Sequence, residues 1–202
     1  MPRPRISTNL AISADGKISS HAGIPSGWTS KADHARLLDL RGNADALMVG
    51  RGTLESDRMT LTVPGKSRQP LRCVVSRCGK FDASHPLFQK PGGDIHLLVT
   101  GPDSPATPGS GAAIHHTGLL DFFEILASVH AVKHLHCEGG GQLIQALAEL
   151  DLIDEFHVTL AGHTLFGGQG ASTATGLPTR FLPATRLYEI GHFEPHPDLG
   201  EC

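Results

Sequence analysis

The sequence has no long apolar run and no excess of basic charge. Its 202 residues carry 17 Lys and Arg against 20 Asp and Glu, a formal net charge of −3, which argues against a general nucleic-acid binder. A membrane-spanning helix needs roughly 18 or more consecutive apolar residues, and no such run is present. No apolar stretch follows the charged N-terminal residues, which argues against a signal peptide. We therefore expect a cytoplasmic protein without nucleic-acid or membrane partners.

Cysteine is scarce, and the cysteines and histidines are not spaced as a complete set of metal ligands. The four cysteines match neither a disulfide scaffold nor a CxxC metal site, so reduced thiols are the simplest expectation. Pairs such as His115 with His116, or His134 with His136, suggest a metal site, but the spacing supplies no third ligand. Residues 136–138 fit the H-x-E of zinc deaminases, yet no P-C-x-x-C follows them. We expect no metal site.

The rest of the composition is that of one globular domain. Hydrophobic residues make up 39% and charged residues 18% of the chain, and this length suits a single domain. The stretches near 63–70, 101–111 and 167–184 are rich in Gly, Pro or Ser, but they are typical of long loops rather than linkers. We expect a single domain over 1–202.

Apolar runs and helical spacings alternate along the chain. A helix is expected to begin at Ser30, with Asp33 three residues on as in a capping box, and others over 119–130 and 141–150. The polar stretch 53–64 is expected to form turns. This alternation predicts an α/β fold with a largely parallel sheet. The predicted strands are 5–14, 46–49, 71–75, 95–100, 112–116, 133–137, 153–160 and 186–193.

Two glycine-rich turns follow predicted strands. In one, a strand ends at Glu138 and 139–141 are all glycine before helical spacing begins at Leu143; in the other, 50–53 read Gly-Arg-Gly-Thr. Glycine lets the backbone approach a ligand closely, and the free amides of a helix's first turn bind phosphate. Each turn alone fits any tight strand-to-helix connection. Together they can hold the two ends of one dinucleotide.

Ordered segments between residues 9 and 143 carry a resemblance to a known family. Residues 9–18 read NLAISADGKI, 28–30 read WTS, 43–54 read NADALMVGRGTL, and 138–143 read EGGGQL. They resemble the "LAxSLDGKI", "WITS", "ADAILVGxGTV" and "EGGxxL" of the riboflavin-biosynthesis reductase domain, which is often fused behind a pyrimidine deaminase and folds like dihydrofolate reductase. The resemblance implies a three-layer α/β fold with a mostly parallel, mixed sheet of about eight strands flanked by helices.

The same resemblance implies a reaction. The cofactor would be NADPH, and the substrate 5-amino-6-(5-phosphoribosylamino)uracil or its 2,5-diamino-pyrimidinone precursor. Hydride would pass to the sugar carbon bonded to the exocyclic nitrogen, converting the ribosyl group to a ribityl chain. We expect a homodimer without a deaminase domain. Whether reduction precedes or follows deamination stays open.

The resemblance also assigns site residues. Lys17, Asp57 and Glu138 would orient the substrate and supply or relay the proton. A cis peptide is expected between Gly139 and Gly140. Arg77 suits the 2′-phosphate of the adenosine because its planar fork binds phosphate bidentately, although an exposed loop arginine fits it equally. The cofactor would be held by Gly50, Arg51, Gly52, Thr53, Ser76, Arg77, Gly139, Gly140, Gly141, Gln142 and Leu143. The substrate would be held by Asn9, Asp15, Thr29, Arg58, Leu61 and Thr62.

Segment 56–64 departs from the family. Where relatives read "ADDPxLTxR", Arg58 replaces the second acid, Met59 the proline and Pro64 the arginine. The anchor of the substrate phosphate is therefore open, and Arg58, Lys66 or Arg68 could replace it. Two alternatives remain: a dihydrofolate-reductase-like enzyme acting on a pterin or another heterocycle, and a non-catalytic NADP-binding protein. The retained polar positions 17, 57 and 138 argue against the second, because binding alone does not require them.

Overall fold

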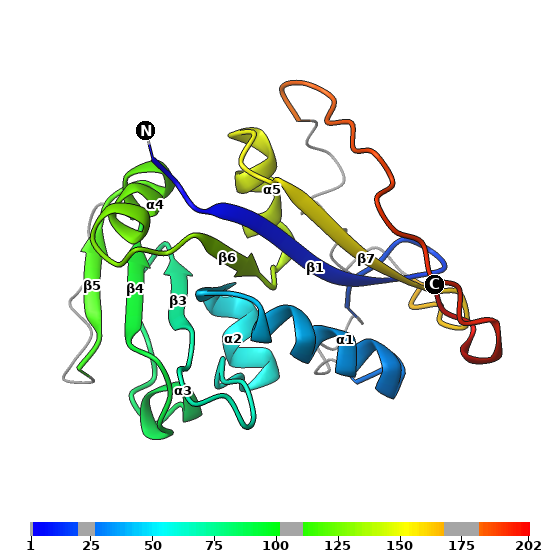
Figure 1. The fold of residues 1–202 in the computed structure, drawn as a ribbon, viewed down its shortest axis with the longest axis horizontal. Coiled ribbons are helices and arrows are strands. Elements are labelled where there is room, and N and C mark those ends of the chain that lie inside the picture. The colour runs from blue at the N-terminus through cyan, green and yellow to red at the C-terminus, as the bar shows by residue number, and fades with distance from the viewer. Residues whose placement is uncertain (1, 20–26, 102–110, 168–181) are drawn as a thin grey trace.

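One sheet organises the chain in this computed structural model, which describes residues 2–19, 27–101, 111–167 and 182–202 (Figure 1). The strands lie in the order β5-β4-β3-β2-β6-β1-β7, and every neighbouring pair is parallel. Parallel strands place their carboxyl ends at one edge, where α/β proteins bind ligands. The strands are β1 (Arg5–Ser13), β2 (Ala46–Gly50), β3 (Leu71–Ser76), β4 (Ile95–Val99), β5 (Ala113–His116), β6 (His134–Cys137) and β7 (Glu155–Ala161).

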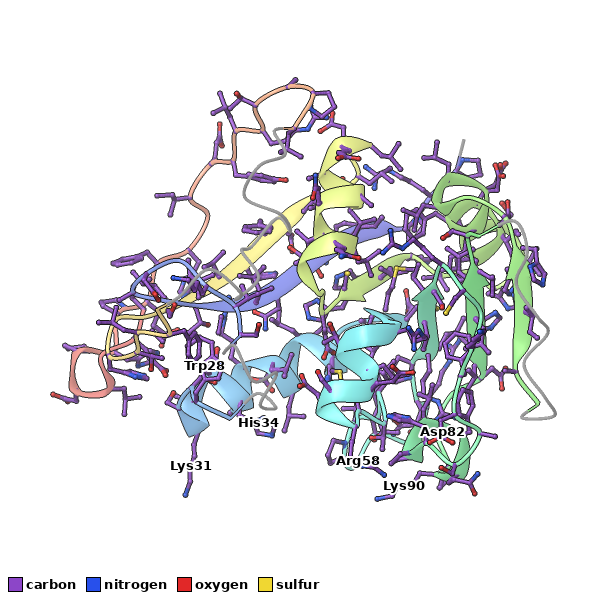
Figure 2. All side chains as sticks on the ribbon, turned by 180° about the vertical axis from the view of Figure 1, so that it is seen from behind. Trp28, Lys31, His34, Arg58, Asp82 and Lys90 are labelled. Carbon is purple, nitrogen blue, oxygen red and sulfur yellow. The ribbon has the colours of Figure 1, made fainter. Side chains whose placement is uncertain are left out.

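Helices cover both faces of the sheet, so the predicted three-layer α/β fold is confirmed (Figures 1 and 2). The core on one face joins Met48 of β2 to Phe122 and Leu147 of the helices, and the core on the other joins Leu47 to Leu54 and Leu87. Alternate residues of a strand point to opposite faces, which is why Leu47 and Met48 belong to different cores. The helices are α1 (Lys31–Gly42), α2 (Arg51–Asp57), α3 (Pro86–Gln89), α4 (Leu119–Ser128), α5 (Gly141–Glu149) and the 3-10 helix η1 (Pro197–Leu199).

Helix α1 lies on the sheet through polar contacts. It begins as predicted, since the Ser30 hydroxyl accepts a hydrogen bond from the Asp33 amide at 3.1 Å. No residue of α1 is fully buried. Its inner side reaches β7 instead, where the Thr159 hydroxyl donates to the Asp33 carboxylate at 2.5 Å. The charged side chains of α1 therefore remain accessible from the space beside the helix.

Two sequence-based predictions are wrong. Within 182–202 the structure forms no strand, only isolated antiparallel bridges from Glu201 to Ala161 and His196, so 186–193 is not an eighth strand and the sheet of the described residues is parallel throughout. Residues 51–57 form helix α2 where turns were expected from 53 onward. This helix buries only Leu54, so it carries no apolar periodicity for a sequence pattern to detect.

Two smaller findings concern membrane-spanning helices and the buried cysteines. Among the described residues no helix is both long and apolar enough to cross a bilayer. Cys73 and Cys137 lie within β3 and β6, where strands were predicted, and both are buried. Burial raises the pKa of both thiols, to about 12 for Cys137. Both thiols are therefore protonated and packed as small apolar groups.

Candidate active site

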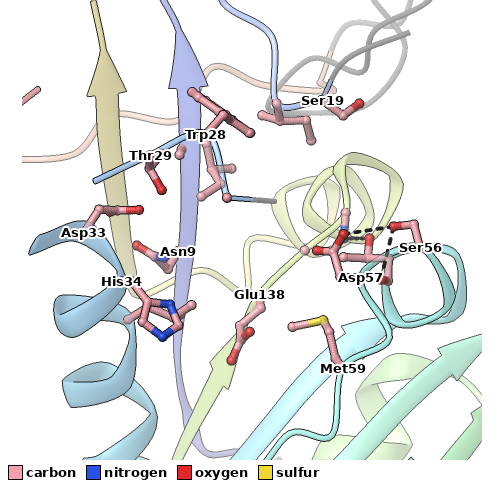
Figure 3. Close-up of a pocket in the computed structure, with 18 of the residues that line it drawn as sticks. Asn9, Ser19, Trp28, Thr29, Asp33, His34, Ser56, Asp57, Met59 and Glu138 are labelled. Atoms are coloured by element: carbon pink, nitrogen blue, oxygen red, sulfur yellow. Dashed lines mark hydrogen bonds between the residues drawn. The ribbon is translucent and has the colours of Figure 1, made fainter. Parts of the chain in front are cut away.

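A cavity of about 740 Å³ opens between α1 and α2, beside the turn that follows β6 (Figure 3). It is bounded by residue 9 of β1, the loop before α1, both helices and segment 58–60. The structure brings ten of the predicted site residues to its wall: Asn9, Thr29, Gly52, Thr53, Asp57, Arg58, Glu138, Gly139, Gly140 and Gly141.

The two glycine turns contact each other directly. The Gly50 amide donates to the Gly139 carbonyl at 2.8 Å, and the Gly140 amide donates to the Thr53 hydroxyl at 3.0 Å. A Cβ on Gly140 would lie 2.7 Å from that hydroxyl oxygen, so the close approach requires glycine. The Gly139-Gly140 peptide is cis, as predicted. Gly140 also caps α5 without a side-chain hydrogen bond, which leaves the Gly141 and Gln142 amides at the start of the helix to a ligand.

Glu138 is held by a partner that the sequence patterns did not indicate. Arg41, in the last turn of α1, donates from Nε to Oε1 at 2.6 Å and from its terminal nitrogen to Oε2 at 2.5 Å. Their side chains are only 12% and 5% exposed. Burial acts to lower the pKa of Arg41, but the Glu138 carboxylate outweighs it and the pKa is raised. The two-point contact therefore fixes the Glu138 carboxylate at the cavity wall.

Two further acceptors line the cavity. Asp57 is the last residue of α2, and its Oδ1 accepts from the Ser56 hydroxyl at 3.2 Å. Asn9 Oδ1 is buried, and no hydrogen bond reaches it from the described residues. A buried polar atom of this kind is usually satisfied, so Asn9 is a candidate contact for a bound ligand or water. Figure 3 shows Asp57 across the cavity from Asn9 and Glu138.

Lys17 and Asp15 stand outside the cavity wall. Lys17 Nζ contacts Asp15 Oδ2 at 2.6 Å, and Asp15 also accepts from the Ser13 hydroxyl and the Gly167 amide. The hydrogen bonds from Lys17, then Ser13 and Gly167, hold the pKa of Asp15 well below its usual value. The geometry shows them fastening the turn after β1 to the loop near residue 167. Their predicted roles in catalysis and substrate binding remain predictions.

The other predicted residues divide into core and rim. Leu61, Leu143 and Ser76 are buried, and the Ser76 hydroxyl accepts from the Gly79 amide. Arg51 pairs with Glu55, and Arg77 donates to the Gln142 side chain at 3.2 Å. Arg77 therefore joins the end of β3 to the first turn of α5. The residues that do not line the cavity are Asp15, Lys17, Gly50, Arg51, Leu61, Thr62, Ser76, Arg77, Gln142 and Leu143.

Sequence analysis assigned to the site none of the α1 residues that line the cavity. They are Lys31, Asp33, His34, Leu37 and Arg41. Positions 34, 37, 38 and 41 fall on one side of a helix, and this spacing is the sequence signal that could have indicated a helix face lining the site. No comparable spacing links Arg41 to Glu138, because the two are 97 residues apart.

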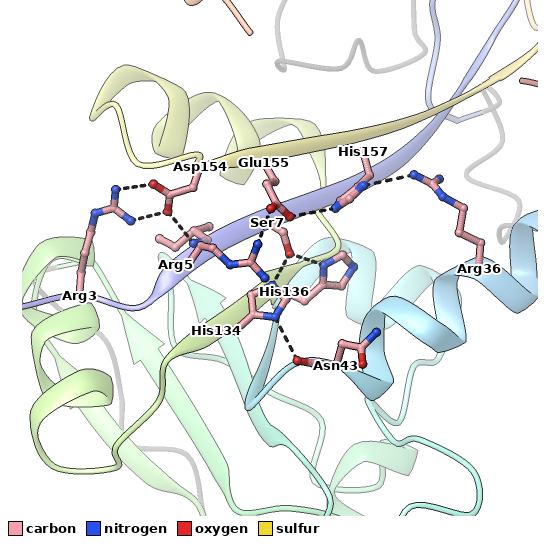
Figure 4. Close-up of polar contacts among 11 residues, drawn as sticks. Arg3, Arg5, Ser7, Arg36, Asn43, His134, His136, Asp154, Glu155 and His157 are labelled. Carbon is pink, nitrogen blue, oxygen red and sulfur yellow. Dashed lines mark hydrogen bonds and ion pairs between the residues drawn. The ribbon is translucent and has the colours of Figure 1, made fainter. Parts of the chain in front are cut away.

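No metal site accompanies this cavity in the part of the chain that the structure describes. There, no group of three or more His, Cys, Asp or Glu side chains is placed to hold a metal ion. His134 and His136 instead share the Ser7 hydroxyl, at 2.7 and 2.8 Å (Figure 4). His96 and His115 contact each other at 3.0 Å.

Buried histidines are expected to make the fold acid-sensitive. Burial, with nearby positive groups, lowers the pKa from 6.5 to about 3 for His136 and to about 4 for His96. Between these values and 6.5 the unfolded chain binds more protons than the folded chain. Stability is therefore complete above pH 6.5 and falls as the pH drops toward 4, by up to about 1.4 kcal/mol per pH unit for each histidine.

Urea unfolding at pH 7.5, 6 and 5 measures this loss. Carboxylates with lowered pKa, such as Asp154 and Glu201, lose their contribution only below about pH 4.5, so they do not obscure it. The same series on His192→Gln, an exposed histidine, should reproduce the wild-type slope. A free energy of unfolding unchanged from pH 7.5 to 5 would contradict the prediction.

Comparison with known proteins identifies relatives over nearly the whole chain. A model of the RibD C-terminal domain family matches residues 4–194. The 2,5-diamino-6-ribosylamino-4(3H)-pyrimidinone 5′-phosphate reductase of Archaeoglobus fulgidus is 30% identical over 206 residues, covering 93% of each chain. The reductase of that name from Methanothermobacter thermautotrophicus is 29% identical over 187 residues, covering 85% of this chain and 83% of its own.

Solved structures support the fold. The Thermotoga maritima diaminohydroxyphosphoribosylaminopyrimidine deaminase/5-amino-6-(5-phosphoribosylamino)uracil reductase aligns with a TM-score of 0.72 at 22% identity, over 88% of this chain. This chain spans 50% of that protein. The Saccharomyces riboflavin biosynthesis reductase aligns with a TM-score of 0.68 at 20% identity, covering 88% of this chain and 80% of its own.

Proposed function

Because the chain belongs to the RibD C-terminal domain family, we propose that its cavity is the active site of an oxidoreductase of riboflavin biosynthesis. The reaction reduces the ribosyl group of a phosphoribosylamino-pyrimidine to the ribityl form. The observation that carries the proposal is the meeting of the joined glycine turns with the Arg41–Glu138 pair at one cavity. Residues 1–202 would act as one reductase domain.

The 2,5-diamino-pyrimidinone is the proposed substrate. The two archaeal relatives that match most of this chain carry that compound in their names. Reduction would then precede deamination. The uracil analogue, named for the Thermotoga protein, is the closest competitor.

NADPH is the proposed cofactor, and the residues present fit it. The Gly140 position admits no side chain beside Thr53, and α5 begins at this turn without a side-chain cap. These features suit a pyrophosphate on the first-turn amides. Arg77, tied to Gln142 at the same helix, suits an adenosine 2′-phosphate. Bound NADPH would supply the hydride.

The protein's own groups would position the substrate and manage the proton. Glu138, fixed by Arg41, would accept hydrogen bonds from the substrate beside the glycine turns. Asn9 Oδ1 would accept one from an amino group of the pyrimidine. Asp57 on the opposite wall would relay a proton from water to the ring oxygen, which takes it up as its bond to the reduced carbon breaks. A carboxylate at hydrogen-bond reach is a typical general acid or base.

Arg58 is the proposed anchor of the substrate phosphate. Of the three cations that could replace the missing family arginine, only Arg58 lines the cavity. Lys66 instead donates to the Gly42 and Ala44 carbonyls. Figure 2 shows Arg58 along the same edge of the molecule as Lys31, a second cation that lines the cavity. We also propose that the enzyme is a homodimer.

A comparison of substrates tests the proposed function. NADPH oxidation should proceed with 2,5-diamino-6-ribosylamino-4(3H)-pyrimidinone 5′-phosphate. With the deaminated analogue, kcat/KM should be at least about tenfold lower, a difference of about 1.4 kcal/mol. Arg58→Ala should raise KM for the phosphorylated substrate and leave NADPH binding unchanged. Turnover of a dihydropterin alone would favour the heterocycle alternative. Tight NADPH binding without turnover of any of the three would favour a non-catalytic protein.

A further inference from the structure

A buried carboxylate holds the residue at which α1 begins. The side chain of Glu201 is only 2% exposed. Its Oε1 accepts from the Ser30 amide at 2.7 Å and from the His163 ring at 3.2 Å, and its Oε2 accepts from the Ser30 hydroxyl. Burial acts to raise the pKa of Glu201, but these hydrogen bonds outweigh it and the pKa is lowered. Ser30 is therefore bound at two points by an ionised group 171 positions away in the chain.

The backbone that carries this carboxylate is fixed on both sides. Residues 200–202 lie antiparallel to the end of β7, where the Leu160 amide donates to the Cys202 carbonyl at 2.8 Å. On the other side, the His196 amide donates to the Glu201 carbonyl at 2.7 Å. The Glu201 side chain is therefore presented to α1 from hydrogen-bonded backbone at the edge of the sheet.

The start of α1 depends on polar contacts of this kind, because no residue of the helix is fully buried. The Ser30 hydroxyl donates to Glu201 and accepts from the Asp33 amide at 3.1 Å, so one hydroxyl serves both the carboxylate and the helix cap. At the far end of the helix, Arg41 binds Glu138. Loss of the Glu201 carboxylate should therefore loosen the residues at the start of α1 and leave its far end in place.

The two residues that precede this helix cap belong to the cavity wall. Trp28 and Thr29 both line the cavity, and Figure 3 shows both on the side where α1 begins. Trp28 packs edge-to-face on Phe166, with the ring centroids 5.0 Å apart. The segment 28–30 is thus held at one end by an aromatic ring and at the other by Glu201.

We propose that Glu201 is a positioning residue of the substrate site, which acts through Ser30 to hold residues 28–29 at the cavity wall. Glu201 does not line the cavity itself, so its effect on a substrate passes through this segment. The glycine turns that would hold the cofactor follow β2 and β6 and do not contact Glu201. The effect on the substrate rests on the proposed reductase function, whereas the position of the wall does not.

Intrinsic fluorescence measures the position of the wall without any substrate, because Trp28 is the only tryptophan in the sequence. In Glu201→Ala the acrylamide quenching constant should rise about twofold, since the contacts that hold the segment are lost. The emission should shift to longer wavelength. Glu201→Gln keeps one acceptor oxygen and should lie between Glu201→Ala and the wild type. Glu194→Ala removes a carboxylate that is 59% exposed in the same part of the chain, and it should match the wild type.

A double-mutant cycle on the same signal shows whether Glu201 acts through Ser30. Ser30→Ala removes the hydroxyl and keeps the amide, so it should give part of the change seen in Glu201→Ala. In the Glu201→Ala background it should add little, because the partner of the hydroxyl is already absent. Fully additive changes in the quenching constant would overturn the path through Ser30.

Steady-state kinetics measures the consequence for the substrate, at a temperature where circular dichroism shows that Glu201→Ala is folded. KM for the 2,5-diamino-pyrimidinone phosphate should rise about tenfold with a smaller change in kcat, and the dissociation constant for NADPH should stay the same. Unchanged quenching in folded Glu201→Ala would overturn the proposal, whether or not the chain is a reductase. Increased quenching with an unchanged KM would overturn the role in substrate binding. If the wild type turns over no substrate, the proposed function fails, and the fluorescence alone decides the position of the wall.

Discussion

Arg41→Met should lower kcat/KM by about 100-fold. The substitution removes both hydrogen bonds that hold Glu138 at the cavity wall, and a displacement of about 1 Å in a site group costs roughly that factor. Because the pair is buried, the unpaired carboxylate should also cost about 3–5 kcal/mol of stability. Steady-state kinetics, at a temperature where circular dichroism shows that the variant is folded, measures the loss of kcat/KM separately from the loss of stability.

A double-mutant cycle shows whether Arg41 acts through Glu138. If it does, Arg41→Met should have little further effect on kcat/KM in a Glu138→Gln background, because the group it positions is already altered. Arg41→Lys should restore part of kcat, since one of the two contacts can re-form. Arg36→Met is the matched control, because Arg36 lies on the same helix but contacts His157 and Thr159 outside the cavity wall. Fully additive effects of Arg41→Met and Glu138→Gln would refute the positioning role.

Among the glycines of the described residues, Gly93 is the one at which alanine should be most destabilising. A Cβ at this position would lie 1.9 Å from the Pro70 carbonyl oxygen and 2.7 Å from its carbon. Both are backbone atoms, which cannot rotate away. The Gly93 carbonyl also accepts from the Arg72 side chain at 2.7 Å, and Arg72 is buried. Relieving the clash would disturb that contact, so we expect a loss of about 3 kcal/mol.

Chemical denaturation of Gly93→Ala beside Gly42→Ala measures the effect. Gly42 ends α1, and a Cβ there meets no atom within 4 Å. Alanine should therefore be neutral or stabilise by up to about 1 kcal/mol at this site. For a chain of this size the Gly93→Ala loss corresponds to a melting temperature lowered by about 6–12 °C. Equal unfolding midpoints for the two variants would show that the Pro70 contact can relax.

Short-range patterns in the sequence determined the fold class and the two turns of the site. The seven strands that form in the described chain were predicted from local runs such as 46–49, which β2 buries, and glycine is required at 140, where the turn approaches Thr53. The start of α1 at Ser30 follows from one side chain and an amide three residues away. Contacts of this kind lie within a few residues of chain, so composition and spacing report them.

The tertiary structure alone decided which side chains share the cavity. Arg41 meets Glu138 only because α1 packs against the sheet beside β6, and no local pattern encodes a contact across 97 residues. Lys17 pairs with Asp15 instead of lining the cavity, and the same Asp15 side chain holds the loop near residue 167. Residues 186–193 have strand-like sequence, yet they form no strand because nothing in the described chain pairs with their backbone. A strand requires a neighbour, and whether one is present depends on the assembled fold rather than on the segment.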